Sequence, residues 1–445
     1  MHMNRRHFLT ALGTGAAAMA LPKLVPAVQA FEDKPNIILI MADDLGYGDV
    51  GCYGNTTITT PNIDTLARAG IRFTDFHSNG AVCSPTRAAL LTGRYQQRCG
   101  IDGVFTARGH RHTGMPLEEV TFAEVLKAGG YTTALFGKWH LGYPVKFNPT
   151  KQGFDVFRGY VSGNVDYHSH IDQQGYNDWW GNCDPVPEKG YVTDLITKHG
   201  VRFIEQNKNR PFCLYLAHES PHYPYQGRED KAERRPGNPG PALGGRTDRG
   251  GAYKEMIEAM DEGIGRIIST VKRLGLERST FIFFCSDNGA ASVGSNSPLR
   301  GQKGTLWEGG HRVPAIAYWP GKIKPSTVTH ETAMTMDLFP TVTAIGGRKL
   351  APGLKIDGVN LFPLLLDGKK LLERTLFWRY RGQKAVRKGP WKLLVRGDKQ
   401  ELYNLADDFA ETKNLAKVER ERVKALRKEL SDWEKEVSAG IKQRT

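Results

Sequence analysis

The segment Ile37-Ile38-Leu39-Ile40-Met41-Ala42-Asp43-Asp44 decides how this chain is expected to fold. Six consecutive apolar residues that end at two aspartates are typical of a strand buried on both faces of a sheet. In open α/β sheets, ligands bind just beyond the carboxyl ends of such strands. The segment therefore predicts one strand of a helix-covered sheet, with Asp43 and Asp44 at a ligand site.

Three more apolar runs end in the same way, each at residues able to do chemistry. Residues 132–136 precede Lys138 and His140, residues 212–216 precede His218 and His222, and residues 280–285 precede Asp287 and Asn288. Because the carboxyl ends of parallel strands meet at one edge of a sheet, we expect a single shared site there.

Amphipathic stretches alternate with the apolar runs. This alternation predicts an α/β fold with a large mixed, mostly parallel sheet flanked by helices. Residues 62–69, closed by Gly70, and residues 253–274 are expected to be scaffold helices. Residues 227–251 are rich in Gly, Pro and Arg and should form a long polar loop, either a solvated linker or a substrate contact.

The length of 445 residues allows a large core and predicts two domains, with the boundary placed between residues 31–365 and 366–445. Near the end, the run Leu402-Tyr403-Asn404-Leu405 is followed by apolar residues at helical spacing, namely Val423, Leu426, Leu430 and Trp433. This pattern predicts a small antiparallel sheet with a helix, packed on the large domain.

The formal net charge of +14 favours long-range attraction to polyanions. Nucleic acid is not expected as a partner, because the sequence has neither a nucleic-acid-binding motif nor an array of aromatic residues for base stacking.

Residues 1–30 are predicted to be an export signal. The paired Arg5-Arg6 is followed by a Gly/Ala-rich apolar stretch, and Val28-Gln29-Ala30 fits a cleavage site. The paired arginines resemble a twin-arginine signal, with a general secretory signal as the alternative. Pro22 and Lys23 interrupt the stretch before the roughly 20 apolar residues that a membrane anchor needs. We therefore expect no membrane anchor, export by the twin-arginine machinery and a periplasmic or secreted protein.

The segment Cys83-Ser84-Pro85-Thr86-Arg87 is followed by the short apolar run Ala88-Ala89-Leu90-Leu91-Thr92. Pro85 suits the first turn of a helix, so Cys83 is expected just before a helix N-terminus, where anions are favoured. The longer pattern resembles the signature of the type I sulfatases, on the alkaline-phosphatase-like fold. The resemblance implies that a formylglycine-generating enzyme converts Cys83 to an aldehyde, whose hydrate attacks the sulfur of a sulfate ester.

Four oxygen donors lie at two predicted strand ends: Asp43, Asp44, Asp287 and Asn288. A hard cation such as calcium takes six to eight oxygens, and no Cys or His spacing suits zinc. Both contexts resemble the calcium ligands of the sulfatases. The resemblance implies one Ca²⁺ per chain, preferred to magnesium, with the residue formed from Cys83 as a further member of the metal site.

The resemblance also implies the catalytic cations and proton carriers. Arg87 and Lys138 hold the sulfate group, together with Lys303 from the motif at residues 299–310. His222 or Lys303 protonates the departing alcohol, and His140 takes a proton from the remaining hydroxyl so that sulfate leaves and the aldehyde returns. The division of roles among His140, His222 and Lys303 stays open at this point.

The substrate is expected to be a sulfated carbohydrate or another sulfate ester. The polar segment at residues 162–170 lies where sulfatases place substrate-facing residues, so Asp166 and His168 are candidates for sugar contacts or, equally, parts of a hydrogen-bonded loop. Two other activities remain open: a phosphomonoesterase or phosphonate hydrolase on the same fold, and a non-catalytic binder of sulfated glycans.

Overall fold

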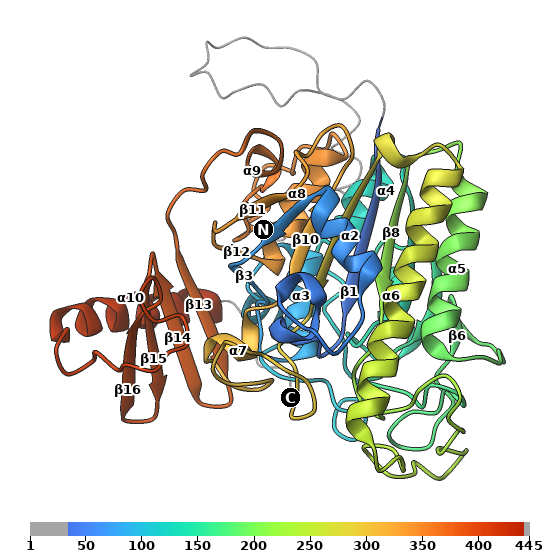
Figure 1. Cartoon of the computed structure of the whole chain (residues 1–445), viewed down its shortest axis with the longest axis horizontal. Coiled ribbons are helices and arrows are strands. Elements are labelled where there is room, and N and C mark those ends of the chain that lie inside the picture. The colour runs from blue at the N-terminus through green and yellow to red at the C-terminus, as the bar shows by residue number, and fades with distance from the viewer. Residues whose placement is uncertain (1–33, 440–445) are drawn as a thin grey trace.

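The computed structural model describes residues 34–439, so the predicted signal at residues 1–30 lies outside the described residues. One sheet of ten strands forms the body of the protein, in the order β11-β2-β10-β9-β1-β8-β4-β5-β6-β7 (Figure 1). The expectation of a large mixed sheet with mostly parallel central strands is confirmed. None of the helices within residues 34–439 is long and apolar enough to cross a membrane.

The four apolar runs singled out in the sequence are neighbours at the centre of this sheet. They form β9 (Thr280–Ser286), β1 (Asn36–Ala42), β8 (Phe212–Ala217) and β4 (Thr132–Lys138), and all their mutual pairings are parallel. The register aligns Met41 with Ala217 and with Cys285. The last residues of the four strands therefore lie along one edge, as the sequence predicted.

The remaining strands extend the sheet on both sides. They are β2 (Ile71–Phe73), β10 (Ala315–Tyr318), β11 (Thr327–Thr329), β5 (Val156–Tyr160), β6 (Trp180–Gly181) and β7 (Asp184–Pro185). Strand β10 runs antiparallel to β9, and β6 runs antiparallel to β5. A separate parallel pair consists of β3 (Phe76–His77) and β12 (Ala333–Met334).

Helices cover both faces of the sheet, because alternate residues of the central strands enter two separate cores. Ile38 and Ile40 pack on the side of α2 (Pro61–Ala69), α5 (Val192–Asn207) and α6 (Arg249–Arg273). Leu39 and Met41 pack on the side of α3 (Cys83–Thr92), α4 (Phe122–Ala128), α8 (Leu338–Ile345) and α9 (Phe362–Asp367). Figure 1 shows α5 and α6 side by side along one face.

Both predicted scaffold helices are present, and α6 begins four residues earlier than expected. The reason is Asp248, whose carboxylate accepts a hydrogen bond of 2.9 Å from the Gly251 amide and so caps the helix. Short 3₁₀ helices occupy residues 47–49, 51–53, 96–99, 145–147, 149–151, 277–279 and 335–337, and α7 (Glu308–His311) is a single turn.

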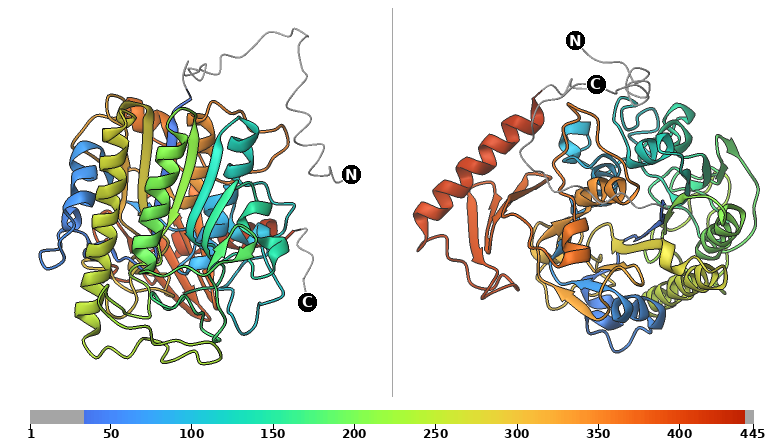
Figure 2. Two further views of the ribbon diagram at one scale, coloured as in Figure 1. Left: turned by 90° about the vertical axis from the view of Figure 1, so that its right-hand side faces the viewer. Right: turned by 90° about the horizontal axis from the view of Figure 1, so that it is seen from above.

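The end of the described chain forms the expected small α+β unit, called here the C-terminal subdomain (residues 375–439). Its antiparallel sheet consists of β13 (Thr375–Tyr380), β14 (Gln383–Lys388), β15 (Trp391–Arg396) and β16 (Lys399–Asn404). Helix α10 (Arg420–Ser438) packs on it, with the Trp433 and Phe377 rings stacked at 5.0 Å. The subdomain projects to one side of the large sheet (Figure 2) and shares a core with Val82 and Leu306.

Candidate active site

The site lies at the carboxyl ends of the central strands. Asp43 and Asp44 follow β1, and Asp287 and Asn288 follow β9; all four side chains are buried. The Asp44 amide donates a 3.2 Å hydrogen bond to Asp287 Oδ1, which ties the two strand ends together. Asp44 adopts a left-handed φ of 65°, a conformation that costs free energy and is often found at functional sites.

Asp43, Asp44, Cys83 and His222 each place one donor atom within 4.8 Å of the others. These residues come from the ends of β1 and β8 and from the start of α3. The topology thus brings together side chains that lie up to 179 positions apart in the chain.

Each buried carboxylate of the site is paired with a cation: Arg87 and Lys138 are buried, and Lys303 is partly buried. Lys138, the last residue of β4, contacts Asp43. Arg87 lies 2.8 Å from Asp287 Oδ2, and Lys303 lies 2.6 Å from Asp44 Oδ1. Three negative and three positive side chains therefore balance, so the protein alone gives a site that is close to neutral. A bound divalent cation would make it positive and suited to an anion.

These pairings shift the pKa values of the groups involved. Burial is the largest single influence and lowers the pKa of Lys303, but the Asp44 and Asp43 carboxylates and Cys83 together outweigh it and hold the pKa well above its ordinary value. The same holds for Arg87 beside Asp287. Both side chains are therefore permanently charged, as the binding of a sulfate group requires.

Two oxygens in the cluster lack hydrogen-bond partners. Asp43 Oδ1 and Asn288 Oδ1 are buried, and no described residue donates a hydrogen bond to either atom. Asn288 instead uses its amide nitrogen, which donates to Asp44 Oδ1 at 2.7 Å. An unsatisfied buried oxygen is costly, and two of them beside two further carboxylates make a donor set that fits a hard, oxygen-seeking cation.

Cys83 is the first residue of α3, and Val82 is its N-cap. The expectation that Cys83 precedes the helix is therefore wrong by one position: the proline lies two residues further on, still within the first turn. Burial, and less strongly the charges of Asp43 and Asp287, raise the pKa of the Cys83 thiol to about 12, against the opposing effect of Lys138 and Lys303. At neutral pH the encoded side chain is a thiol and a weak nucleophile.

His140 is held as a neutral ring with one free nitrogen. Its Nε2 lies 2.7 Å from the Phe105 carbonyl oxygen, and because a carbonyl oxygen only accepts, Nε2 carries the proton. Nδ1 is buried and has no partner within residues 34–439. Burial and the Lys138 ammonium lower the pKa of His140 well below its ordinary value. The ring can therefore accept a proton at Nδ1.

His222 lies next to Asp44. Its Nδ1 is 2.6 Å from the Tyr223 carbonyl oxygen, so Nδ1 donates and the lone pair of the neutral ring is on Nε2. Nε2 lies 3.7 Å from Asp44 Oδ2. Lys303, by contrast, has protons to give.

Asp166 and His168, the candidates for sugar contacts, are both engaged with the protein. The Asp166 carboxylate is buried and accepts five hydrogen bonds, from the amides of His168, Ser169, Glu233 and Arg234 and from the Gln226 side chain. His168 Nε2 lies 3.0 Å from the Gly227 carbonyl oxygen. Both residues fasten the loop that follows residue 226, so a direct sugar contact by either stays a prediction.

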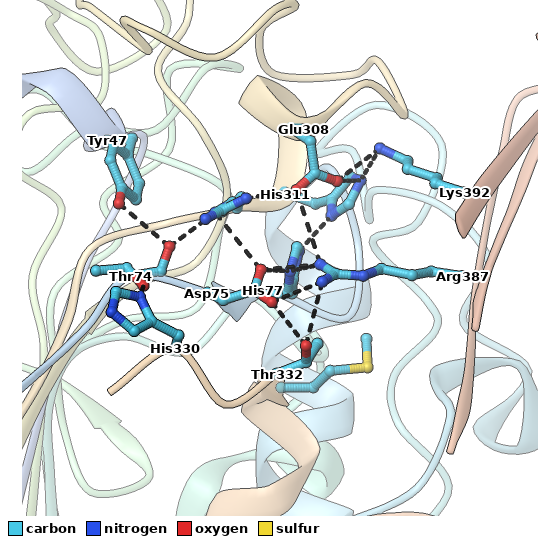
Figure 3. Close-up of polar contacts among 12 residues, drawn as sticks. Tyr47, Thr74, Asp75, His77, Glu308, His311, His330, Thr332, Arg387 and Lys392 are labelled. Atoms are coloured by element: carbon cyan, nitrogen blue, oxygen red, sulfur yellow. Dashed lines mark hydrogen bonds and ion pairs between the residues drawn. The ribbon is translucent and has the colours of Figure 1, made fainter. Parts of the chain in front are cut away.

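A second buried polar cluster, absent from the sequence predictions, joins the C-terminal subdomain to α7 (Figure 3). His77 Nδ1 and His311 Nδ1 are 3.0 Å apart, and His77 Nε2 lies 2.8 Å from Asp75. From the subdomain, Lys392 reaches Glu308 at 2.8 Å and Arg387 reaches Asp75 at 2.7 Å.

This cluster holds the loop that carries Lys303, because α7 begins five residues after it. The Glu308 amide donates to Glu411 of the C-terminal subdomain at 2.6 Å, and the Gly309 amide donates to the Arg300 carbonyl oxygen at 2.7 Å. The cations Lys392 and Arg387 already neutralise the carboxylates. Three residues of the cluster, His77, Glu308 and His311, are close enough to one another to hold a metal ion. Because Lys392 and Arg387 already supply the positive charge, we interpret the cluster as a structural contact between the subdomain and α7.

Comparisons with known proteins agree with this geometry. The sulfatase family model matches residues 35–347. Over 400 residues the chain is 40% identical to arylsulfatase A of Homo sapiens. The alignment covers 80% of this chain and 74% of that protein. It is 35% identical to N-acetylgalactosamine-6-sulfatase of Mus musculus over 92% of this chain and 79% of that protein.

Among solved structures, Ps i-CgsB in complex with k-i-k-neocarrahexaose superposes with a TM-score of 0.82 at 31% identity, over 90% of this chain and 93% of that chain. The family match spans most of the described chain and includes the four strand ends, Cys83 and Lys303. The chain belongs to the sulfatase family and hydrolyses sulfate esters.

Proposed function

We propose that this chain is an exported, calcium-dependent sulfatase that removes sulfate from carbohydrates, with formylglycine made from Cys83 as its nucleophile. One observation supports the proposal above the others: two buried oxygens, Asp43 Oδ1 and Asn288 Oδ1, accept no hydrogen bond from residues 34–439 and lie in a cluster of charge-balanced carboxylates beside Cys83. Such an arrangement is costly unless a cation occupies it.

Calcium would be held by Asp43, Asp44, Asp287 and Asn288, next to the residue formed from Cys83. When bound, it supplies positive charge that polarises a sulfate group. The raised pKa of the Cys83 thiol supports the modification, because an unconverted thiol would be almost entirely protonated at neutral pH. Conversion requires a formylglycine-generating enzyme as a partner.

The residues of the chain then bind and move protons. Arg87 and Lys138, whose charges are fixed by Asp287 and Asp43, orient the sulfate oxygens. Lys303 is the better placed donor to the departing alcohol, because neutral His222 keeps its proton on the Tyr223 side. His140 accepts a proton at its free Nδ1 when sulfate leaves.

Sulfated carbohydrates are the proposed natural substrates. The relative from Mus musculus is named for a sulfated amino sugar, and the structurally similar Ps i-CgsB was solved with an oligosaccharide. The net charge of +14 would attract a polyanionic chain. Export through the twin-arginine machinery to the periplasm or beyond forms part of the same proposal and depends on residues 1–30.

The test compares turnover of an aryl sulfate with that of the matching aryl phosphate, after mass spectrometry of the peptide that contains Cys83. We expect an aldehyde at position 83, turnover of the sulfate and loss of turnover in Cys83→Ala. Cys99→Ala is the matched control, because Cys99 is also a buried, unbridged cysteine but is not among the residues that gather around Asp43 and Asp44. A preference for the phosphate, or full activity with an intact thiol, would contradict the proposal.

A further inference from the structure

The hairpin between β13 and β14 has an unusual residue at its tip. The two-residue turn Arg381-Gly382 joins Tyr380 to Gln383, with φ of 46° at Arg381 and 75° at Gly382. Two-residue hairpin turns with positive φ at both positions favour Asn, Asp or Gly first, and an L-residue with a long side chain costs about 1–2 kcal/mol there. The hairpin between β15 and β16 has Gly397 at the equivalent place. Folding alone does not explain Arg381.

This hairpin touches the loop that carries Lys303. Gln383 Nε2 donates to the Gly304 carbonyl oxygen at 3.0 Å, and Gln383 Oε1 accepts from the Leu306 amide at 3.4 Å. The Tyr380 ring lies 3.7 Å from the position that a Cβ on Gly304 would occupy. Tyr380 also packs in the same core as Val82, the residue before Cys83. The hairpin therefore forms a wall beside the loop that carries Lys303.

Arg381 presents a free positive charge at that wall. Its guanidinium lies 5.2 Å from the centroid of the Tyr380 ring, its side chain is exposed, and it forms no ion pair with any carboxylate of the described chain. Arg379, two residues earlier on β13, is by contrast paired with both Asp102 and Glu434. Arg381 is thus one aromatic ring away from the Lys303 loop, and its guanidinium donates no hydrogen bond to any group within residues 34–439.

We propose that Arg381 determines specificity by binding a second anionic group, a sulfate or carboxylate, on the carbohydrate whose scissile sulfate lies at the Lys303 site. The proposal rests on the proposed function and adds that the preferred substrates carry at least two anionic groups. A guanidinium fork matches the oxygens of both groups. The Tyr380 ring beneath it limits where the guanidinium can lie, which reduces the entropy lost on binding.

Arg381→Asn provides the test, because asparagine suits the turn and the variant should fold at least as well as the wild type. Lys399→Asn is the matched control: it removes one exposed positive charge at the start of β16 in the same sheet. Both variants and the wild type, each with the extent of Cys83 conversion measured, are assayed on an aryl sulfate, a disulfated disaccharide and a monosulfated disaccharide that contains a uronate.

We expect Arg381→Asn to lower kcat/KM about 10- to 100-fold on one or both dianionic sugars, mostly through KM, as the loss of a charge-assisted contact predicts. The aryl sulfate should be unaffected, and Lys399→Asn should match the wild type on every substrate. A loss confined to the disulfated sugar identifies sulfate as the second group, and one confined to the uronate identifies carboxylate. The proposal would be overturned if Arg381→Asn had the same kcat/KM as the wild type on every substrate. It would also be overturned if the variant lost as much activity on the aryl sulfate as on the sugars. A wild type inactive on the aryl sulfate and on both sugars would count against the proposed function instead.

Discussion

The variant Glu411→Gln should change how the stability of the protein depends on pH. Glu411 is buried between the C-terminal subdomain and α7: one carboxylate oxygen lies 2.9 Å from Lys392 Nζ and the other accepts the Glu308 amide at 2.6 Å. The Glu411 carbonyl oxygen also accepts from the Arg300 guanidinium. Burial, with the nearby Glu308 charge adding to it and Lys392 opposing it, raises the pKa of Glu411 from 4.5 to about 7.

The direction in which stability changes with pH follows from the number of protons bound in the native and unfolded states. Between pH 4.5 and 7 the native state holds a proton on Glu411 that the unfolded state has lost, so the contribution is fully present below pH 4.5 and is lost as the pH rises through 7. A shift of about 2.5 units corresponds to about 3 kcal/mol of unfolding free energy at most. Because glutamine cannot ionise, Glu411→Gln should not lose this contribution.

Urea unfolding at pH 5 and at pH 8, with calcium held constant, measures the difference. Relative to Glu411→Gln, the wild type should lose about 2.5 kcal/mol between the two values, because at pH 5 a small part of the contribution is already lost. Glu421→Gln, an exposed position on α10, is the control and should follow the wild type. If the wild type and Glu411→Gln differ by the same amount at pH 5 and pH 8, Glu411 is ionised throughout and the reasoning fails.

Three further predictions concern the site and its surroundings. Chelation of calcium should abolish sulfate hydrolysis and lower the melting temperature, and added calcium at 100 times its Kd should restore about 2.7 kcal/mol, measured by thermal unfolding. Arg87→Lys should reduce kcat/KM about 100-fold, because lysine cannot keep both contacts of the guanidinium to Asp287 while it faces the sulfate; a loss below threefold would contradict this role. Asp166→Asn should loosen the loop fastened at Glu233 and Arg234 at a cost of about 1–3 kcal/mol, seen as faster proteolysis there, with kcat on an aryl sulfate little changed.

The centre of the fold could be predicted because its signals are local. Continuous apolar runs identify strands buried on both faces, and each run ends at a chemically distinctive pair of residues such as Asp43-Asp44 or Asp287-Asn288. The rule that ligands bind at strand carboxyl ends then places these pairs together without knowledge of the strand order. The start of α3 was misjudged by one residue, because Pro85 is compatible with any position in the first turn.

The surroundings of the site could not be predicted in the same way, because their signals are not local. Lys392 and Glu308 are 84 positions apart, and each alone looks like an ordinary charged residue of a strand or helix end. Nothing in the sequence near Lys392 indicates that it is fully buried, since a lysine in an antiparallel strand usually faces solvent. Lys392 and Glu308 meet only when the C-terminal subdomain packs against the large domain. That packing depends on long-range contacts around Val82 and Leu306.

The same limit explains Asp166. A polar loop of this composition suits substrate contact, yet the carboxylate is buried and accepts five hydrogen bonds, several from residues about 60 to 70 positions further along the chain. A buried carboxylate saturated by amides is a structural device, because the amides stabilise its charge and leave no free lone pair for a ligand. The active site has the opposite character: Asp43 Oδ1, Asn288 Oδ1 and His140 Nδ1 are buried, and none of them has a hydrogen-bond partner in the described part of the chain. Asp43, Asn288 and His140 thus offer acceptor atoms where the chemistry requires a cation and a base, whereas the Asp166 carboxylate has none left to offer.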